Sequence, residues 1–173
     1  MDFSFAKIMI AKSTKKYYIL VMKINIVCVG KIKEHFFTDA INEYLKRISR
    51  FADLKIIEVD EESKLANLEQ KSKAEGEKLL QKCSGVIVAL DGGGKLLSST
   101  EIADFVHKKE VQGESVISFV IGGSNGLSKE LLSKADLILS FGKITFPHQL
   151  FRVVLVEQIY RALTIIEGLP YHK

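Results

Sequence analysis

The stretch SVISFVIGGSNGLS, residues 115–128, combines a strand, a glycine-rich turn and the approach to a helix. Val116 to Ile121 form a nearly continuous apolar run, which is typical of a strand that is covered on both faces. Glycines follow the run at once, and a short helix is expected over 128–134. A strand that leads directly into a helix is the building unit of α/β proteins.

The same unit recurs along the chain. Strands are expected at 23–30, 54–60, 85–91 and 136–142, and helices at 34–51, 65–83 and 148–166. Another helix opens at Ser98 or Ser99, with Glu101 as its capping partner. Strands that alternate with helices predict one α/β domain with a mostly parallel sheet and helices on both faces. No internal repeat interrupts this order.

The composition fits one globular domain: the chain has 173 residues, of which 47% are hydrophobic and 27% charged. Residues 1–23 carry five lysines against Asp2, which accounts for the whole net charge of +4, so the remainder sums to zero. A nucleic-acid contact must therefore come from a local patch of charge. Cys28 lies in an apolar run and is expected in the core. Neither cysteine has zinc-ligand spacing, and no metal is expected; a reducing cytoplasm fits this usage.

Residues 1–21 have a different character from the rest. Their apolar stretches are short and broken by lysines, which predicts neither a transmembrane helix nor a signal peptide. We expect an N-terminal extension over 1–21, with Met22 as the natural beginning of a single domain over 22–173.

Three expected strands end in glycine-bearing loops, at Leu90–Gly94, Ile121–Gly126 and Phe141–Lys143. Ligands of open α/β sheets bind beyond the carboxyl ends of strands, and glycines there let the backbone approach a ligand closely. The loops match neither the dinucleotide fingerprint nor the Walker A motif. They therefore predict a binding site of another kind.

The loop after residue 121 also fits G-x-S-x-G, the motif of a serine hydrolase, with Ser124 as nucleophile. Asp136 and then His148 or His172 follow in the matching chain order. The chain is short for that fold, and Asp136 opens an expected strand when it should follow one. A helix cap or a ligand-loop residue is the simpler interpretation of Ser124.

The segment ITFPHQLFRVVLVEQIYRAL, residues 144–163, holds the densest chemistry. Pro147 suits a helix start, which puts His148 at the helix N-terminus and Arg152 one turn later on the same face. Arg161 lies farther along an apolar surface, with Glu157 as its candidate ion-pair partner.

Together, VIGGSNGLS, LSFGKITFPHQLFRVVLVEQIYRA and the terminal PYHK resemble the ribosomal RNA large subunit methyltransferase H family. The resemblance spans residues 22–173 and leaves 1–21 without a counterpart. It implies a SPOUT-class domain with a C-terminal trefoil knot, a rare exception to unknotted folds. It also implies a homodimer that methylates N3 of a pseudouridine in 23S rRNA of the assembled ribosome. S-adenosyl-L-methionine would be the methyl donor, held at Leu90, Gly122, Phe141, Gly142, Lys143, Ile144, Thr145 and Phe146.

On this resemblance, His148 and Arg152 would orient or polarise the target base, with Arg152 and Lys173 on the RNA side. Tyr171, His172 and Lys173 would close over the site, from their own subunit or from the partner. Two alternatives stay open at this point: the serine hydrolase, and a ribosome-binding module without catalysis.

Overall fold

The computed structural model describes residues 21–173, so the expected extension, apart from Val21, lies outside the described residues. Within the described residues, five strands form one parallel sheet in the order β2-β1-β4-β3-β5. The strands are β1 (Met22–Val29), β2 (Ala52–Val59), β3 (Val86–Leu96), β4 (Val116–Ile121) and β5 (Leu137–Ser140). The helices between them are α1 (His35–Ile48), α2 (Leu68–Lys82), α3 (Ser99–Val111), α4 (Lys129–Lys134) and α5 (His148–Ile166). The α/β prediction with a parallel sheet is confirmed.

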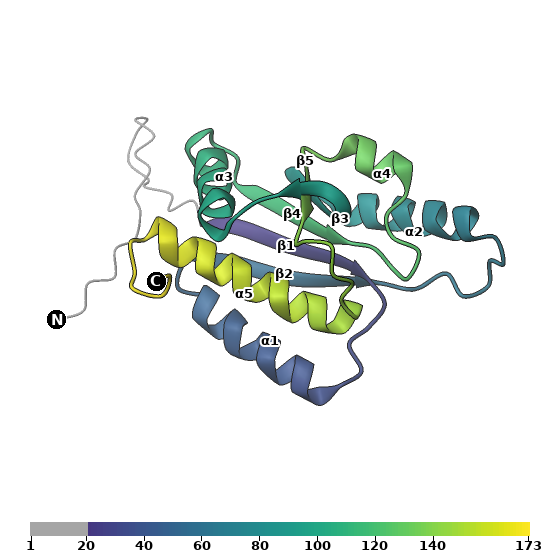
Figure 1. Ribbon diagram of the computed structural model, residues 1–173, viewed down its shortest axis with the longest axis horizontal. Coiled ribbons are helices and arrows are strands. Elements are labelled where there is room, and N and C mark those ends of the chain that lie inside the picture. The colour runs from purple at the N-terminus through teal and green to yellow at the C-terminus, as the bar shows by residue number, and fades with distance from the viewer. Residues whose placement is uncertain (1–20) are drawn as a thin grey trace, which may run out of the picture.

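Helices cover both faces of the sheet (Figure 1). One core cluster joins Ile24, Ile26 and Cys28 of β1 to α1, α3 and α5. The other joins Val27 and Val29 of the same strand to α2 and α4. Because successive strand side chains point to opposite faces, burial on both faces produces the unbroken apolar runs of the sequence.

Strand β3 is longer than expected. The sequence predicted that the strand ends in a glycine-bearing loop at Leu90–Gly94, but β3 continues through these residues to Leu96, with a shift in its register against β5 between Leu90 and Lys95. The strand then pairs with β5 a second time, with Lys95 opposite Leu139. A Cβ on Gly94 would lie 2.7 Å from the carbonyl carbon and oxygen of Ile138. The glycine therefore allows β3 to run against the backbone of β5, which is why the strand continues where the sequence predicted a loop.

Helix α3 begins as the sequence predicted. The Ser98 side chain accepts the Glu101 backbone N–H, and the Glu101 carboxylate in turn accepts the Ser98 backbone N–H at 2.7 Å. This capping box satisfies donors that the first helical turn leaves free.

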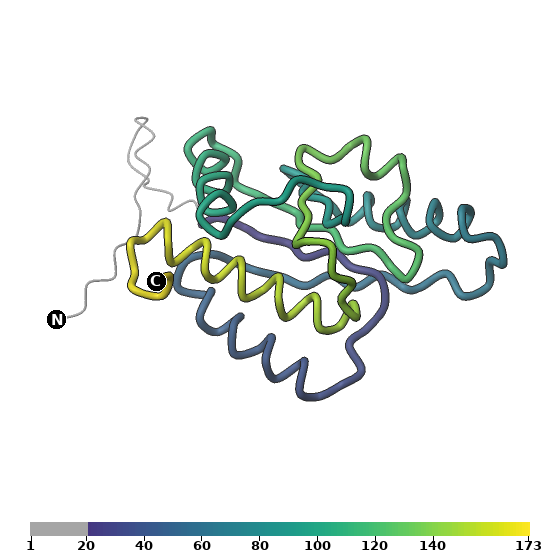
Figure 2. Tube along the Cα trace, viewed as in Figure 1, coloured from purple at the N-terminus to yellow at the C-terminus, as the bar shows by residue number. Residues whose placement is uncertain are grey.

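Helix α5 lies against both α1 and α3 on its face of the sheet. Since it follows β5, its N-terminus lies at the carboxyl edge of the strands and its C-terminus at the opposite edge. The continuous trace shows the chain from β5 entering α5 directly beside the sheet (Figure 2). The two ends of α5 therefore lie at opposite edges of the sheet.

Candidate functional site

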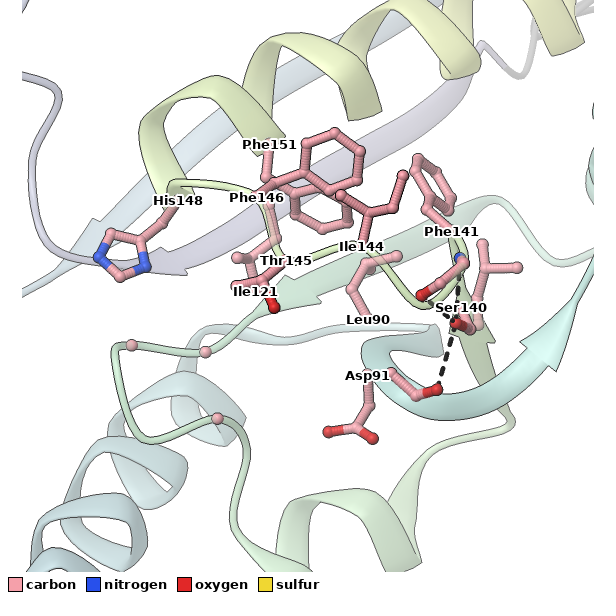
Figure 3. A pocket seen from close by; sticks show the side chains of 16 residues that line it. Leu90, Asp91, Ile121, Ser140, Phe141, Ile144, Thr145, Phe146, His148 and Phe151 are labelled. Carbon is pink, nitrogen blue, oxygen red and sulfur yellow. Dashed lines mark hydrogen bonds between the residues drawn. The ribbon is translucent and has the colours of Figure 1, made fainter.

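A pocket of about 240 Å³ opens at the carboxyl edge of β3, β4 and β5 (Figure 3). Each of the three predicted glycine-bearing loops contributes to its wall. Strand β3 supplies Leu90, Asp91 and Gly92, and the end of β4 with the loop after it supplies Ile121, Gly122, Gly123 and Gly126. The segment from β5 into α5 supplies Leu139, Ser140, Phe141, Gly142, Ile144, Thr145, Phe146, His148 and Phe151. Parallel strand order explains why loops so far apart in the sequence meet here.

The loop after β4 is a tight turn whose backbone forms part of the pocket wall. The Gly126 N–H donates to the Gly123 carbonyl at 3.1 Å and closes the turn. A Cβ on Gly122 would lie 2.7 Å from the carbonyl carbon and oxygen of Gly126. Any larger residue at 122 would force the turn apart, so glycine is needed for a ligand to meet the backbone here.

Hydrogen bonds of Ser140 connect the part of the pocket wall that follows β5 to the part formed by β3. The Ser140 hydroxyl lies 3.3 Å from both the Gly92 and the Gly142 carbonyl oxygens, and accepts the Gly142 N–H at 3.2 Å. Beyond it, Phe151 packs edge-on to Phe141 and stacks with Phe146, with ring centroids 5.2 and 5.7 Å apart. These rings fix the chain between β5 and α5 (Figure 3).

His148 lies at the rim of this pocket, on the exposed first residue of α5. Pro147 precedes it as the N-cap, as the sequence predicted. Glu61 lies within electrostatic range: its pKa is lowered mainly by the hydrogen bond from Lys71, with a smaller contribution from the charge of His148. Because His148 is exposed, its imidazole is accessible to an incoming ligand.

Arg152 lies elsewhere than the sequence suggested. Its side chain is 1% exposed and does not line the pocket. The guanidinium donates to Glu58 Oε1 at 2.8 Å and to the Val29 and Gly30 carbonyls at 2.7 and 2.8 Å. Helical spacing places Arg152 on the same face of α5 as His148. This face is exposed at His148, but one helical turn later, at Arg152, it is buried against the sheet. The expectation that Arg152 faces the substrate is therefore corrected: it ties α5 to the end of β1.

The C-terminal tail folds back along α5. The Tyr171 hydroxyl donates to Glu157 Oε1 at 3.1 Å, and its ring packs edge-on to Tyr160 with centroids 4.8 Å apart. Arg161 pairs with the same Glu157 atom at 2.6 Å, which confirms the predicted ion pair. His172 Nδ1 lies 3.4 Å from Arg161, and Lys173 is exposed. None of the three tail residues lines the pocket of its own chain.

Of the eight residues assigned to a donor, all except the exposed Lys143 line the pocket. The predicted binding loops also contain Asp91, Gly92, Ile121, Gly123 and Gly126, which line the pocket although the donor assignment did not name them. Sequence reasoning missed Leu139, Ser140 and Phe151. Leu139 and Ser140 directly precede the predicted loop that begins at Phe141, so extending that loop backward would have found them. Phe151 had no such signal, because an apolar residue in an apolar helix resembles core.

The geometry does not assemble a serine-hydrolase triad. Ser124 follows β4, whereas Asp136 precedes β5, and parallel strands place these positions at opposite edges of the sheet. The Asp136 carboxylate is also engaged, since its Oδ2 accepts the Ile87 N–H at 2.8 Å. The G-x-S-x-G match is a β-turn between Gly123 and Gly126.

Within residues 21–173, no cluster of His, Cys, Asp and Glu side chains is arranged to hold a metal ion. The helices in this range include none with the length and apolar character needed to span a membrane.

Comparison with known proteins places this architecture in a class. A family model described as predicted SPOUT methyltransferase matches residues 22–172, so the chain belongs to the class of SPOUT methyltransferases. A probable methylase family protein from Haemophilus influenzae has a similar fold, with a TM-score of 0.50 at 16% identity over 87% of this chain and 70% of that one.

Closer relatives define the family. The ribosomal RNA large subunit methyltransferase H of Carboxydothermus hydrogenoformans is 53% identical over 159 residues, covering 88% of this chain and all of the relative. The proteins of the same name from Clostridium novyi and Lactococcus lactis are 48% and 50% identical, with the same coverage. The chain belongs to the ribosomal RNA large subunit methyltransferase H family.

Proposed function

We propose that this protein transfers a methyl group from S-adenosyl-L-methionine to N3 of a pseudouridine in 23S rRNA of the assembled ribosome. The observation that carries the proposal is the convergence of three glycine-bearing strand ends on one pocket, in a chain about half identical to ribosomal RNA large subunit methyltransferases H. Such a substrate would place the enzyme in the cytoplasm.

The pocket has the chemistry for a nucleoside-like donor. Leu90 and Ile121 offer apolar surface, and the Gly122–Gly126 turn offers backbone at close range. Asp91 uses Oδ1 to accept the Gly93 N–H at 2.8 Å, which leaves Oδ2 as an acceptor at the pocket wall. When bound, S-adenosyl-L-methionine supplies a methyl group on a positively charged sulfonium. The residues of the wall bind and orient the donor and exclude water around it.

On the acceptor side, N3 of the base must lose a proton as it gains the methyl group. His148 is the titratable side chain at the rim that is open to the base, so we assign it the role of orienting the base or receiving this proton. Arg152 acts from behind as a positioning residue, since it fixes the first turns of α5 through three hydrogen bonds. Lys173 is assigned to a phosphate of the RNA.

A second copy of the chain would complete the site. Helix α5 has 19 residues and is roughly 28 Å long, and the tail packs near Glu157 and Arg161 while the pocket lies at the other end. Pairing of two α5 helices antiparallel about a two-fold axis would bring the tail of each chain beside the pocket of the other. Ile144, 76% exposed at the pocket mouth, suits such burial. The 240 Å³ volume is also below the ~300–1,000 Å³ of pockets that enclose a ligand.

The proposal includes the trefoil knot of the class. In support, β3 overlaps β5 twice, and Ser140 lies against Gly92 where the chain leaves β5 for α5. A knotted chain stretched from its two ends in an optical trap stays shorter than its contour length. Full extension would contradict the knot.

Calorimetry with S-adenosyl-L-methionine tests the donor site, and methyl transfer to ribosomes from a strain without this modification tests the reaction. Binding and transfer are expected. Ribosome association without donor binding would favour a module without catalysis.

The shared site has its own test in mixed dimers. Gly122→Val would close one pocket, and truncation after Pro170 would remove one tail. Each variant alone should be inactive, whereas a mixture of the two should regain activity because one intact pocket meets one intact tail. No recovery in a verified heterodimer would overturn the shared site.

A further inference from the structure

Helix α2 carries a buried acid that the donor site does not yet explain. Glu75 is 1% exposed, and its Oε1 accepts the Glu62 backbone N–H at 3.0 Å. Its Oε2 is buried and has no hydrogen-bond partner among the described residues. A buried oxygen without a donor costs free energy, so the position requires an explanation.

The carboxylate lies directly behind the pocket wall. A Cβ on Gly123 would lie 2.8 Å from Glu75 Oε2, so only a glycine lets the acid approach the turn this closely. The next residue along α2 is packed just as tightly, because a Cβ on Gly76 would lie within van der Waals overlap of the Ser128 hydroxyl. Two successive residues of α2 thus fix this helix against the segment 123–128.

The turn itself holds a group of complementary character. The Asn125 amide nitrogen is buried and also has no hydrogen-bond partner within residues 21–173. Asn125 does not line the pocket, although Gly123 and Gly126 on either side of it do. Its amide is therefore buried in the protein and is not part of the pocket wall. A buried donor within the 123–126 turn and a buried acceptor beside Gly123 thus both lack a hydrogen-bond partner in the described part of the chain.

We propose that Glu75 and Asn125 form a latch for the donor: when the Gly122–Gly126 turn settles on S-adenosyl-L-methionine, the Asn125 amide donates to Glu75 Oε2. This inference rests on the proposed donor site. A ligand shifts a conformational equilibrium by the difference in its affinity for the two states. The free enzyme keeps these two buried polar atoms apart, and the bound enzyme pairs them. Glu75 is a positioning residue in this scheme, because it acts on the donor through the turn.

The test exchanges the polarity of the pair. Glu75→Gln keeps Oε1 for the Glu62 N–H and puts a donor where the acceptor was; Asn125→Asp puts a second acid opposite the first. Each single variant should weaken S-adenosyl-L-methionine binding by about tenfold, measured by calorimetry. The double variant should bind within about threefold of the wild type, because the amide introduced on α2 can then donate to the carboxylate introduced in the turn. Glu77→Gln, an exposed residue of α2 with the same change in charge, is the matched control and should bind normally.

Stability of the free enzyme separates the latch from a structural role. Glu75→Gln should leave the melting temperature without donor equal or higher, since it removes a buried charge, while donor affinity falls. A loss of stability that accounts for the loss of binding would overturn the latch, as would unchanged affinity in Glu75→Gln. If that variant does not fold, normal affinity in Asn125→Asp would overturn the latch in its place. Absence of any donor binding by the wild type would instead reject the proposed donor site.

Discussion

Tyr171 donates a hydrogen bond to Glu157 of its own chain, and the same carboxylate oxygen pairs with Arg161. The tail is thereby held near the C-terminal end of α5, while His148 stands at the rim of the pocket at the N-terminal end. This contact holds the last residues of the chain near the C-terminal end of α5, where they do not reach the pocket of the same chain.

Truncation after Pro170 should leave donor binding within about threefold of the wild type and reduce methyl transfer by at least about a hundredfold. The pocket keeps every one of its own residues, whereas the proposed reacting site loses Tyr171 and His172. Calorimetry and transfer of a labelled methyl group to ribosomes measure the two effects separately. Unchanged turnover would contradict the role of the tail as a lid.

The docking of Tyr171 should depend on pH. Burial, followed by hydrogen bonds with Tyr44 and Glu157, raises the pKa of Tyr171 to about 12 from its ordinary value of 10. A raised pKa contributes stability that is complete below pH 10 and is lost as the pH rises toward 12. The difference in tyrosinate absorbance between wild type and Tyr171→Phe should therefore show a transition near pH 12. A transition near pH 10 would mean that the tail is not docked.

Arg152→Met should lower the free energy of unfolding by about 3 kcal/mol, because it leaves Glu58 and two carbonyl groups without their donor. Arg152→Lys should recover part of this loss, since a single ammonium cannot reach all three acceptors at once. In urea unfolding, the double variant with Glu58→Gln should lose less than the sum of the single variants. Full additivity would argue against the pair.

Glycine at position 94 should be essential for the junction of β3 and β5, whereas glycine at position 92 should not. Gly94→Ala places a Cβ against the Ile138 backbone and should cost about 1–3 kcal/mol of unfolding free energy. Gly92→Ala meets no atom within 4 Å and is the matched control, with an expected change below about 0.5 kcal/mol. Equal effects of the two substitutions would reject the close approach as the cause.

Neither cysteine should react in the folded enzyme at about pH 8. Burial raises the pKa of Cys28 to about 11, although the charge of Arg152 opposes the shift, and burial also raises that of Cys83 to about 11. The thiolate is the reactive form, so iodoacetamide should label both residues only after unfolding. Rapid labelling of the native protein, located by mass spectrometry, would show that the surrounding core opens.

The sequence predicted the sheet and the edge that carries the pocket because both depend on local patterns. Apolar runs such as Val116–Ile121 mark strands buried on two faces, and parallel order then brings their glycine ends together. The outcome at Arg152 depended on the reach of a long side chain, which helical spacing does not specify. The burial of Glu75 could not be predicted for a related reason. A glutamate in a helix rich in charged residues is expected to be exposed to solvent, and only the packing of Gly76 against Ser128 shows that this face of the helix is buried.

The orientation of α5 also has a consequence for dosage. If each active centre takes its donor cleft from one polypeptide and its covering segment from another, a monomer cannot modify the ribosome. At low expression, the cell's capacity to modify ribosomes would then grow with the square of the enzyme's copy number. Modest repression of the gene would silence the modification far more sharply than it depletes the protein.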